Sequence, residues 1–216
     1  MRLFGPGTGH VKICGITNEK DALDCVEAGT DALGFNFFPG SSRCISLESL
    51  EWIRGLNGIV DRVAVVVNPE QELIDTLWRS RCFEMIQFHG DESPTLCAMS
   101  GVTNWMKAIR VRNRESLAEA NRFSTPHILL DSWSPAAYGG TGKTADWKMI
   151  GEFLAEHPEH RFVLAGGLNP ENVADAIRTT RPAAVDVAGG VEESPGKKDP
   201  AKVRAFIAAA RGALCP

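Results

Sequence analysis

Short apolar runs alternate along the chain with amphipathic segments, and the two together repeat about every 25 residues. Apolar runs bounded by polar residues or glycine are typical of buried strands, and amphipathic segments are typical of surface helices. The runs that we expect to form strands are Val11–Cys14, Ala32–Phe38, Arg62–Val67, Met85–Phe88, Trp105–Val111, His127–Leu130, Phe162–Gly167 and Ala183–Gly190.

Polar cap residues, several of them followed by proline, mark where the helices between these runs begin. They are Asn18, Ser46, Asn68 before Pro69, Ser93 before Pro94, and Asp199 before Pro200. The first predicted helix extends from Asn18 to about Ala28. Further helices are expected around Arg114–Asn121, over Trp147–Leu154 and between Leu168 and Arg178. The chain therefore contains about eight strand–helix units.

Regular strand–helix alternation implies parallel strands joined by right-handed crossovers, which leaves an open doubly wound sheet or a closed barrel. The count of about eight units, the similar helices and the polar residues at several strand ends favour closure. No G-x-G-x-x-G opens the first helix, which weakens the dinucleotide-binding alternative. We therefore predict a single (β/α)₈ TIM barrel domain over residues 1–216, with residues 1–10 as a short N-terminal arm.

Composition narrows the class of protein. The chain has 216 residues, of which 44% are hydrophobic, enough for one globular core. A net charge of −4 without a basic run argues against nucleic-acid binding, and no apolar stretch is long enough for a bilayer. The six cysteines have neither C-x-x-C nor metal-ligand spacing, which favours reduced thiols in a cytoplasmic protein without a metal site.

The two glycine pairs that end the last two strands predict a phosphate site. Gly166 and Gly167 end one run, Gly189 and Gly190 end the next, and an amphipathic helix joins them. Backbone amides without side chains, aided by a helix N-terminus, favour a dianion. In a barrel of this type the loops after strands seven and eight are the usual phosphate cup.

Side chains alternate along a strand, so the chemistry can be placed on the inner face. Lys12 and Cys14 share a face of the first strand, and Asp131 ends the sixth at the same level. Cys14 stands before a glycine at a strand end, which favours chemistry over burial as a small hydrophobe. Asp186 is either a structural partner for Lys12 or a functional carboxylate. Asp131 either caps the following turn or takes part in chemistry, and we favour chemistry.

Two further features lie between strand ends and leave alternatives open. His89 shares a face with Gln87 and either orients its loop or touches a substrate. The segment Gly139–Thr144 resembles a P-loop, but Ala137 stands where that motif needs glycine. We read residues 132–144 as a mobile lid in which Trp133 and Tyr138 cover a ring or exclude water, or else as an exposed loop.

Several motifs together resemble N-(5′-phosphoribosyl)anthranilate isomerase. They are Lys12-Ile-Cys-Gly-Ile-Thr17, Gly34-Phe-Asn-Phe37 with Ser42-Arg43, Gln87-Phe-His-Gly90, Leu129-Leu-Asp131, Gly139-Gly-Thr-Gly142, Asp146-Trp147, Leu164 to Val173, Val185-Asp-Val187, and Gly190-Val-Glu192 with Gly196 to Asp199. The resemblance implies a TIM barrel that performs an Amadori rearrangement of an aminoaldose to an aminoketose in tryptophan biosynthesis, without cofactor or metal. A phosphosugar would be its partner, with no nucleic acid or membrane, and the protein would be a monomer or homodimer.

The resemblance also implies roles for single residues. Asp131 matches the general acid that opens the ribose ring, and Cys14 matches the general base that removes the C2 proton. Arg43 and Asp186 match substrate-binding residues, and we place His89 with them. A thiol base needs a lowered pKa, and we expect Lys12 or Arg43 to lower the pKa of Cys14.

One departure from the family pattern and two rival functions remain. The family usually shows two serines where this chain has Ala188 and Gly189, so we predict retained function with weaker phosphate binding. The related isomerase of the histidine pathway would show aspartates at positions 14 and 131, and Cys14 argues against it. A catalytically idle barrel would have lost the acid or the base, and both are present.

Overall fold

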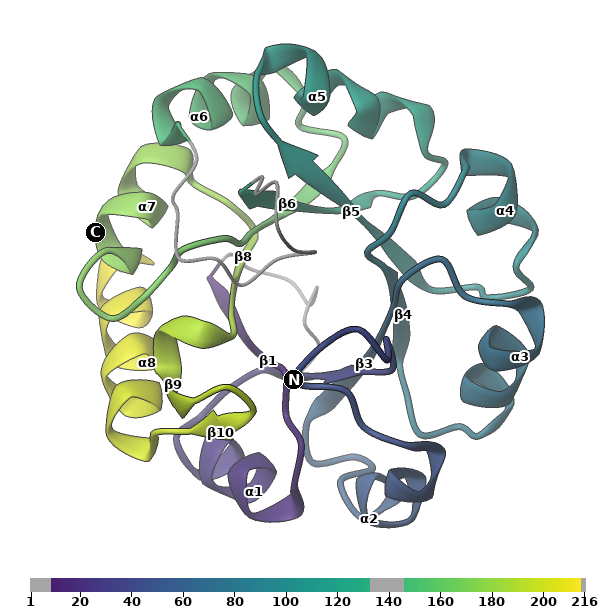
Figure 1. Cartoon of the computed structure of the whole chain (residues 1–216). Coiled ribbons are helices and arrows are strands. Elements are labelled where there is room, and N and C mark those ends of the chain that lie inside the picture. Colours follow the sequence, from purple (N-terminus) through teal and green to yellow (C-terminus); the bar gives the residue numbers. More distant parts are fainter. Residues whose placement is uncertain (1–8, 133–145, 215–216) are drawn as a thin grey trace.

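The computed structural model describes residues 9–132 and 146–214, and these residues form a closed barrel of eight parallel strands surrounded by helices (Figure 1). Each strand pairs with its sequence neighbours, and β1 pairs with β8 to close the barrel. Strands β1 to β8 span His10–Cys14, Ala32–Asn36, Asp61–Val66, Met85–Phe88, Trp105–Val111, His127–Ser132, Arg161–Leu164 and Ala184–Val187. The predicted (β/α)₈ barrel is confirmed, and the open sheet is excluded.

A helix follows every barrel strand. Helices α1 to α8 span Glu19–Glu27, Leu50–Arg54, Gln71–Arg79, Pro94–Met99, Arg114–Ala118, Trp147–Glu156, Val173–Thr180 and Pro200–Leu214. Short 3₁₀ turns lie at Leu47–Ser49 (η1), Glu119–Arg122 (η2) and Gly189–Val191 (η3). After β8 the chain adds a small antiparallel hairpin of β9 (Glu192–Ser194) and β10 (Lys197–Lys198), which lies beside α1 and α8 in Figure 1.

Most predicted helix starts are confirmed, and two are corrected. The side chains of Asn18 and Ser93 accept hydrogen bonds from backbone amides in the first turns of α1 and α4. Asn68 is wrong as an N-cap, because α3 begins later, at Gln71, and Asn68 adopts a left-handed conformation with φ 46°. Its side chain accepts instead from the Asp91 amide in the next loop. Ser46 precedes a 3₁₀ turn, and α2 starts only at Leu50.

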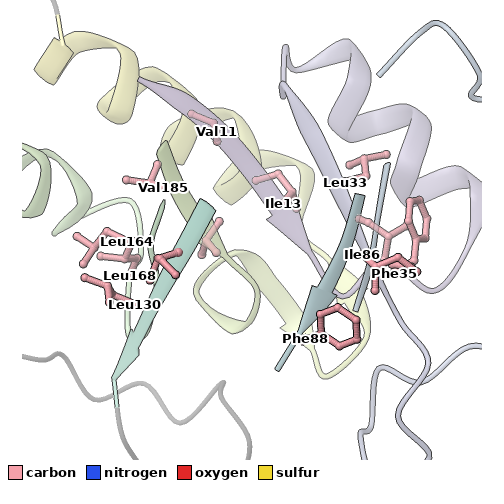
Figure 2. Close-up of a cluster of buried hydrophobic side chains, with 14 of the residues drawn as sticks. Val11, Ile13, Leu33, Phe35, Ile86, Phe88, Leu130, Leu164, Leu168 and Val185 are labelled. Atoms are coloured by element: carbon pink, nitrogen blue, oxygen red, sulfur yellow. The ribbon is translucent and has the colours of Figure 1, made fainter. Parts of the chain in front are cut away.

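The barrel wall separates two apolar clusters. Outward-facing strand residues pack against the helices, and Figure 2 shows part of this outer cluster. Ile13, Val185 and Val187 belong to it, as the pleat predicts. The smaller inner cluster fills the barrel and consists of Ala32, Val63, Met85, Met106, Ala108, Leu129, Val163, Ala165 and Ala184. The inward-facing positions at the carboxyl ends of the strands, beyond this cluster, are occupied by polar side chains such as Asp131 and Asp186.

The N-terminal end of the barrel corrects one predicted boundary. His10 begins β1 and is buried, and the amide of Gly9 donates to the carbonyl of Ala183, so neither residue belongs to an arm. Residues 1–8 of the expected arm lie outside the described residues. Within residues 9–132 and 146–214, no helix has the length and apolar character needed to cross a membrane.

Candidate active site

A cavity of about 340 Å³ opens at the carboxyl end of the barrel strands. Its wall contains all nine residues that the sequence assigns to the site, although they come from six separate parts of the chain. They are Cys14, Arg43, His89, Asp131, Gly166, Gly167, Asp186, Gly189 and Gly190. The structure therefore brings the predicted acid, base, anion-binding and glycine positions to one place.

The closing seam of the barrel places a buried ion pair beside Cys14. Lys12 of β1 lies in register with Asp186 of β8, and the Lys12 ammonium donates to Oδ1 of Asp186 at 2.8 Å. Lys12 is 0% exposed, so the pair lies in a low-dielectric environment. Burial alone would lower the pKa of Lys12, but Asp186 and the Cys14 sulfur raise it above its ordinary value. The ammonium is therefore a fixed positive charge below Cys14.

Lys12 lowers the pKa of Cys14, as expected, but the expected net fall of this pKa is wrong, because its net shift is upward. Burial raises the pKa of this thiol, and this effect exceeds the opposing effect of Lys12. Asp186 raises the pKa further, while Lys198 lowers it. The sequence shows the cations but not the depth at which the sulfur lies, and burial disfavours the thiolate. In the site without substrate, this upward shift favours the thiol form of Cys14.

Asp131 and His89 contact each other in the wall of the cavity. Nε2 of His89 lies 3.3 Å from Oδ2 of Asp131, and Nδ1 lies 2.7 Å from the side-chain nitrogen of Gln87. Asp131 and Gln87 are buried, and His89 is nearly so. The sequence left two roles open for His89, orienting its loop or touching a substrate. The structure adds a contact that neither role included, with the candidate acid Asp131.

Arg43 is held by a carboxylate that the sequence reasoning did not assign. Its guanidinium makes two hydrogen bonds to Glu192, from Nε at 2.8 Å and from Nη2 at 2.6 Å. Burial alone would raise the pKa of Glu192, but Arg43 and Lys198 hold it below its ordinary value. The two partners are 149 residues apart, so local spacing gives no sign of the pair.

Lys198 of β10 joins this ion pair to the backbone around the site. Its ammonium donates to the carbonyl of Cys14 at 2.7 Å, to the carbonyl of Ala188 at 3.2 Å, and to Glu192 at 2.9 Å. Lys198 is buried, and each of its three N–H groups has an acceptor. The hairpin therefore connects the end of β1, the loop after β8 and the clamp on Arg43.

The glycine loops have the geometry of an anion cradle. Gly166 and Gly167 have φ of 85° and 68°, which residues with a side chain rarely adopt. A Cβ atom on Gly190 would overlap the carbonyl oxygen of Leu168, so the two loops approach each other closely. The amides of Gly166, Gly167, Gly189 and Gly190 have no acceptor in the described part of the chain. They line the cavity beside Cys14.

A further buried ion pair lies behind His89 and was not predicted from the sequence. The Lys107 ammonium lies 2.9 Å from Oε2 of Glu92 and also donates to the carbonyls of Phe88 and Gly90. Glu92 accepts in turn from the amides of Asn68 and Gly90. The pair therefore ties the loops after β3 and β4 to β5.

The predicted lid over residues 132–144 lies outside the described residues, apart from the end of β6. Among residues 9–132 and 146–214, no group of three or more His, Cys, Asp or Glu side chains is arranged to hold a metal ion.

Comparison with known proteins decides the family. The model of the N-(5′-phosphoribosyl)anthranilate (PRA) isomerase family matches residues 11–209 of this chain. The chain belongs to the PRA isomerase family. A relative named N-(5′-phosphoribosyl)anthranilate isomerase from Trichlorobacter lovleyi is 46% identical over 94% of this chain and 98% of the relative. The one from Neisseria meningitidis is also 46% identical, over 93% of this chain and 96% of the relative.

Solved structures of PRA isomerases share the fold over nearly the whole chain. The enzyme from Thermotoga maritima superimposes with a TM-score of 0.85 at 44% identity, covering 94% of this chain and 98% of that one. A PRA isomerase in complex with reduced 1-(o-carboxyphenylamino)-1-deoxyribulose 5-phosphate has a TM-score of 0.82 at 42% identity, with the same coverage. Monomers generated from the dimeric Thermotoga maritima enzyme give the same score and identity.

Proposed function

We propose that this chain converts N-(5′-phosphoribosyl)anthranilate to 1-(2-carboxyphenylamino)-1-deoxyribulose 5-phosphate by general acid–base catalysis, as a step of tryptophan biosynthesis. One observation carries the proposal: in a member of this family, the Cys14 thiol, the Asp131 carboxyl and an anion cradle line the same cavity. An aldose–ketose rearrangement needs an acid at the ring oxygen and a base at C2, and the phosphate needs an anchor away from both.

Asp131 is the general acid of the first step. It donates its proton to the ribose ring oxygen as the C1–O bond breaks, and the bonding electron pair stays on that oxygen. The lone pair of the anilino nitrogen forms the C1=N bond, which gives an open-chain iminium ion. His89, 3.3 Å from Oδ2, stabilises the carboxylate that this transfer leaves behind.

Cys14 is the general base of the second step. It removes the proton from C2, the C2–H electron pair forms a C1=C2 bond, and the electron pair of the iminium bond returns to nitrogen. The resulting enolamine ketonises at C2 and gains a proton at C1. The thiol is favoured in the free site, so its deprotonation depends on nearby positive charge. Lys12 supplies one such charge, and the iminium ion of the substrate supplies a second.

The other cavity residues bind the two ends of the substrate. The amides of Gly166, Gly167, Gly189 and Gly190 hold the 5-phosphate, since main-chain N–H groups suit an anion. Arg43, fixed by Glu192, meets the anthranilate carboxylate or a charged intermediate. His89 and Asp186 contact the sugar and the amino nitrogen. The structure of a similar enzyme with a reduced product bound supports this class of ligand.

The same proposal covers cofactors, partners and location. The acid–base route consumes no redox equivalent and needs neither cofactor nor metal, and the phosphosugar is the one partner that it requires. We place the protein in the cytoplasm, without a nucleic-acid or membrane partner, because its family is biosynthetic. We expect a monomer or a homodimer, and the dimeric Thermotoga maritima enzyme supports the second.

Two measurements test the function. The purified protein should convert the anthranilate substrate, followed by the change in anilino fluorescence, and its gene should rescue a tryptophan auxotroph that lacks this isomerase. A parallel assay with the aminoaldose substrate of the histidine-pathway isomerase tests the rival activity. Turnover of that second substrate alone, or no rescue from a folded protein, would reject the proposal.

A further inference from the structure

Gln87 is fully buried below the candidate active site, at a position where packing alone would favour an apolar residue. Its strand neighbours Ile86 and Phe88 point outward into the barrel–helix cluster (Figure 2), so Gln87 faces the barrel interior. In the adjacent strands it lies in register with Val65 and Met106, which are also buried. A buried amide costs free energy unless it makes hydrogen bonds. The hydrogen bond that the Gln87 side chain makes therefore indicates what Gln87 does in this position.

The Gln87 amide bonds to the His89 ring. Its Nε2 lies 2.7 Å from Nδ1 of His89, while its Oε1 has no partner within the described part of the chain. With the amide nitrogen of Gln87 facing the ring, Nδ1 of His89 accepts, and a neutral ring then has its proton on Nε2. This nitrogen faces Oδ2 of Asp131 at 3.3 Å and donates to it.

The backbone around His89 is held by different groups. The amide of His89 donates to the carbonyl of Val66 at 2.8 Å. The Lys107 ammonium donates to the carbonyls on either side of His89, at 3.3 Å to Phe88 and 2.7 Å to Gly90. These bonds fix the main chain but do not distinguish the two ring nitrogens. Ring orientation and tautomer are therefore set by the side-chain contacts, with Gln87 at Nδ1 and Asp131 at Nε2.

We propose that Gln87 is a positioning residue for the acid step: it fixes the Nε2–H tautomer of His89 and thereby gives Asp131 a permanent hydrogen-bond donor on Oδ2. The proposal deepens the proposed function and rests on it. With Oδ2 occupied by His89, Oδ1 is the oxygen from which the proposed acid step takes its proton, and no hydrogen bond joins Oδ1 to another described residue. Asp131 lines the cavity, so Oδ1 is the oxygen left to serve the substrate.

The hydrogen bond from His89 to Asp131 should stabilise the transition state of the acid step more than the ground state. As the proton leaves Oδ1 for the ribose ring oxygen, negative charge grows on the carboxylate. The neutral Nε2–H···O bond then becomes charge-assisted and strengthens. The opposite tautomer would present a lone pair to this charge and repel it. Loss of Gln87 should therefore lower kcat more than it raises KM.

The tautomer is measured directly by ¹⁵N NMR of protein labelled at histidine, with His89→Asn used to assign the His89 signals. In the wild type, Nε2 should carry the proton and Nδ1 should not. In Gln87→Glu, the carboxylate accepts from the ring, so Nδ1 should become protonated. A wild-type His89 protonated on Nδ1 would overturn the proposal, and this result does not depend on the folding of any Gln87 variant.

The kinetic arm compares Gln87→Met with Met106→Leu, a neighbouring interior substitution of similar size that removes no hydrogen bond. We expect kcat of Gln87→Met to fall about 10- to 100-fold, the loss of a hydrogen bond to a charged group, with KM changed less than about threefold. Met106→Leu should keep kcat within about threefold of the wild type. Equal kcat values for the two variants would refute the role of Gln87.

The two proposals fail in different ways. A folded wild type without isomerase activity rejects the proposed function, and the NMR result then still decides whether Gln87 sets the His89 tautomer. An active wild type with the Nδ1–H tautomer rejects the positioning role and leaves the function intact.

Discussion

Two of the buried lysine–carboxylate pairs among the described residues look alike in distance and differ in their surroundings. Lys12 lies 2.8 Å from Asp186, and Lys107 lies 2.9 Å from Glu92. Backbone carbonyls and amides saturate the second pair, so its charges serve the loops around it. The first pair has the Cys14 sulfur as its neighbour, and Asp186 lines the cavity. The Lys107–Glu92 pair, whose hydrogen bonds are all made with the protein, stabilises the fold. The Lys12–Asp186 pair keeps hydrogen-bonding capacity toward the cavity and can act on a substrate.

The largest effect should come from removing the proposed acid or the proposed base itself. We expect Cys14→Ala and Asp131→Ala each to lower kcat by about 10²–10⁴-fold, the usual contribution of a positioned acid or base. Steady-state turnover provides the measurement, and titration with the reduced product analogue should show nearly unchanged binding. Near-normal turnover in either variant would reject that residue's role.

Stability should separate the two pairs next. Lys107→Met leaves the Glu92 carboxylate buried without its cation, and we expect it to lower the free energy of unfolding by about 3–5 kcal/mol. Lys12→Met should cost less, because the Asp186 side chain is 8% exposed and faces the cavity, whereas that of Glu92 is 0% exposed. Urea unfolding of both variants checks the order, and equal losses would contradict the distinction.

The pH profile should respond to Lys12 but not to Lys107. Lys12 lowers the pKa of Cys14 against the opposing effect of burial, so Lys12→Met should raise that pKa further. In the proposed mechanism the Cys14 thiolate is the active form, so activity should rise with pH through this titration. The rising limb of kcat/KM should move to higher pH in Lys12→Met. An unmoved limb would show that Lys12 does not act on the thiol.

The smallest effect concerns the phosphate loop. Gly189→Ser restores one hydroxyl of the usual family pattern, and we expect KM to fall about tenfold if that hydroxyl donates to phosphate. Gly189 has no positive φ, so serine fits its backbone. Gly190→Ala is the contrasting change, since its Cβ would overlap the Leu168 carbonyl and KM should rise. An unchanged KM in Gly189→Ser would assign anion binding to the amides alone.

Sequence periodicity and the strand-end residues were sufficient for the barrel and for the places of Cys14, Asp131 and the glycine pairs, whereas Arg43 was assigned only through the family resemblance. Alternation along each strand placed Lys12 and Cys14 inward and Val185 and Val187 outward, and the structure agrees. Glycine pairs and strand-end polar residues mark the carboxyl end of any parallel sheet, so Asp131 could be placed without coordinates. These features have short-range signals because strand pleat and turn conformation are local properties.

Long-range pairing and burial depth were beyond the sequence. Nothing in the spacing joins Arg43 to Glu192, because the bond depends on the hairpin after β8 folding back over β1. Asn68 looked like a helix cap, but the loop after β4 uses its side chain instead. The pKa of Cys14 was expected to fall, yet its sign depends on how much protein surrounds the sulfur.

Because β1 and β8 pair in register at the active site, recovery of activity during refolding should report when these two strands dock. Lys12 and Asp186 are 174 positions apart, and they meet only when the first and final strands dock. Ordering so long a loop is entropically costly, which favours late formation of this contact. Recovery of turnover during refolding should therefore lag behind recovery of the helical circular dichroism signal. The length of this delay would measure how long the barrel takes to close.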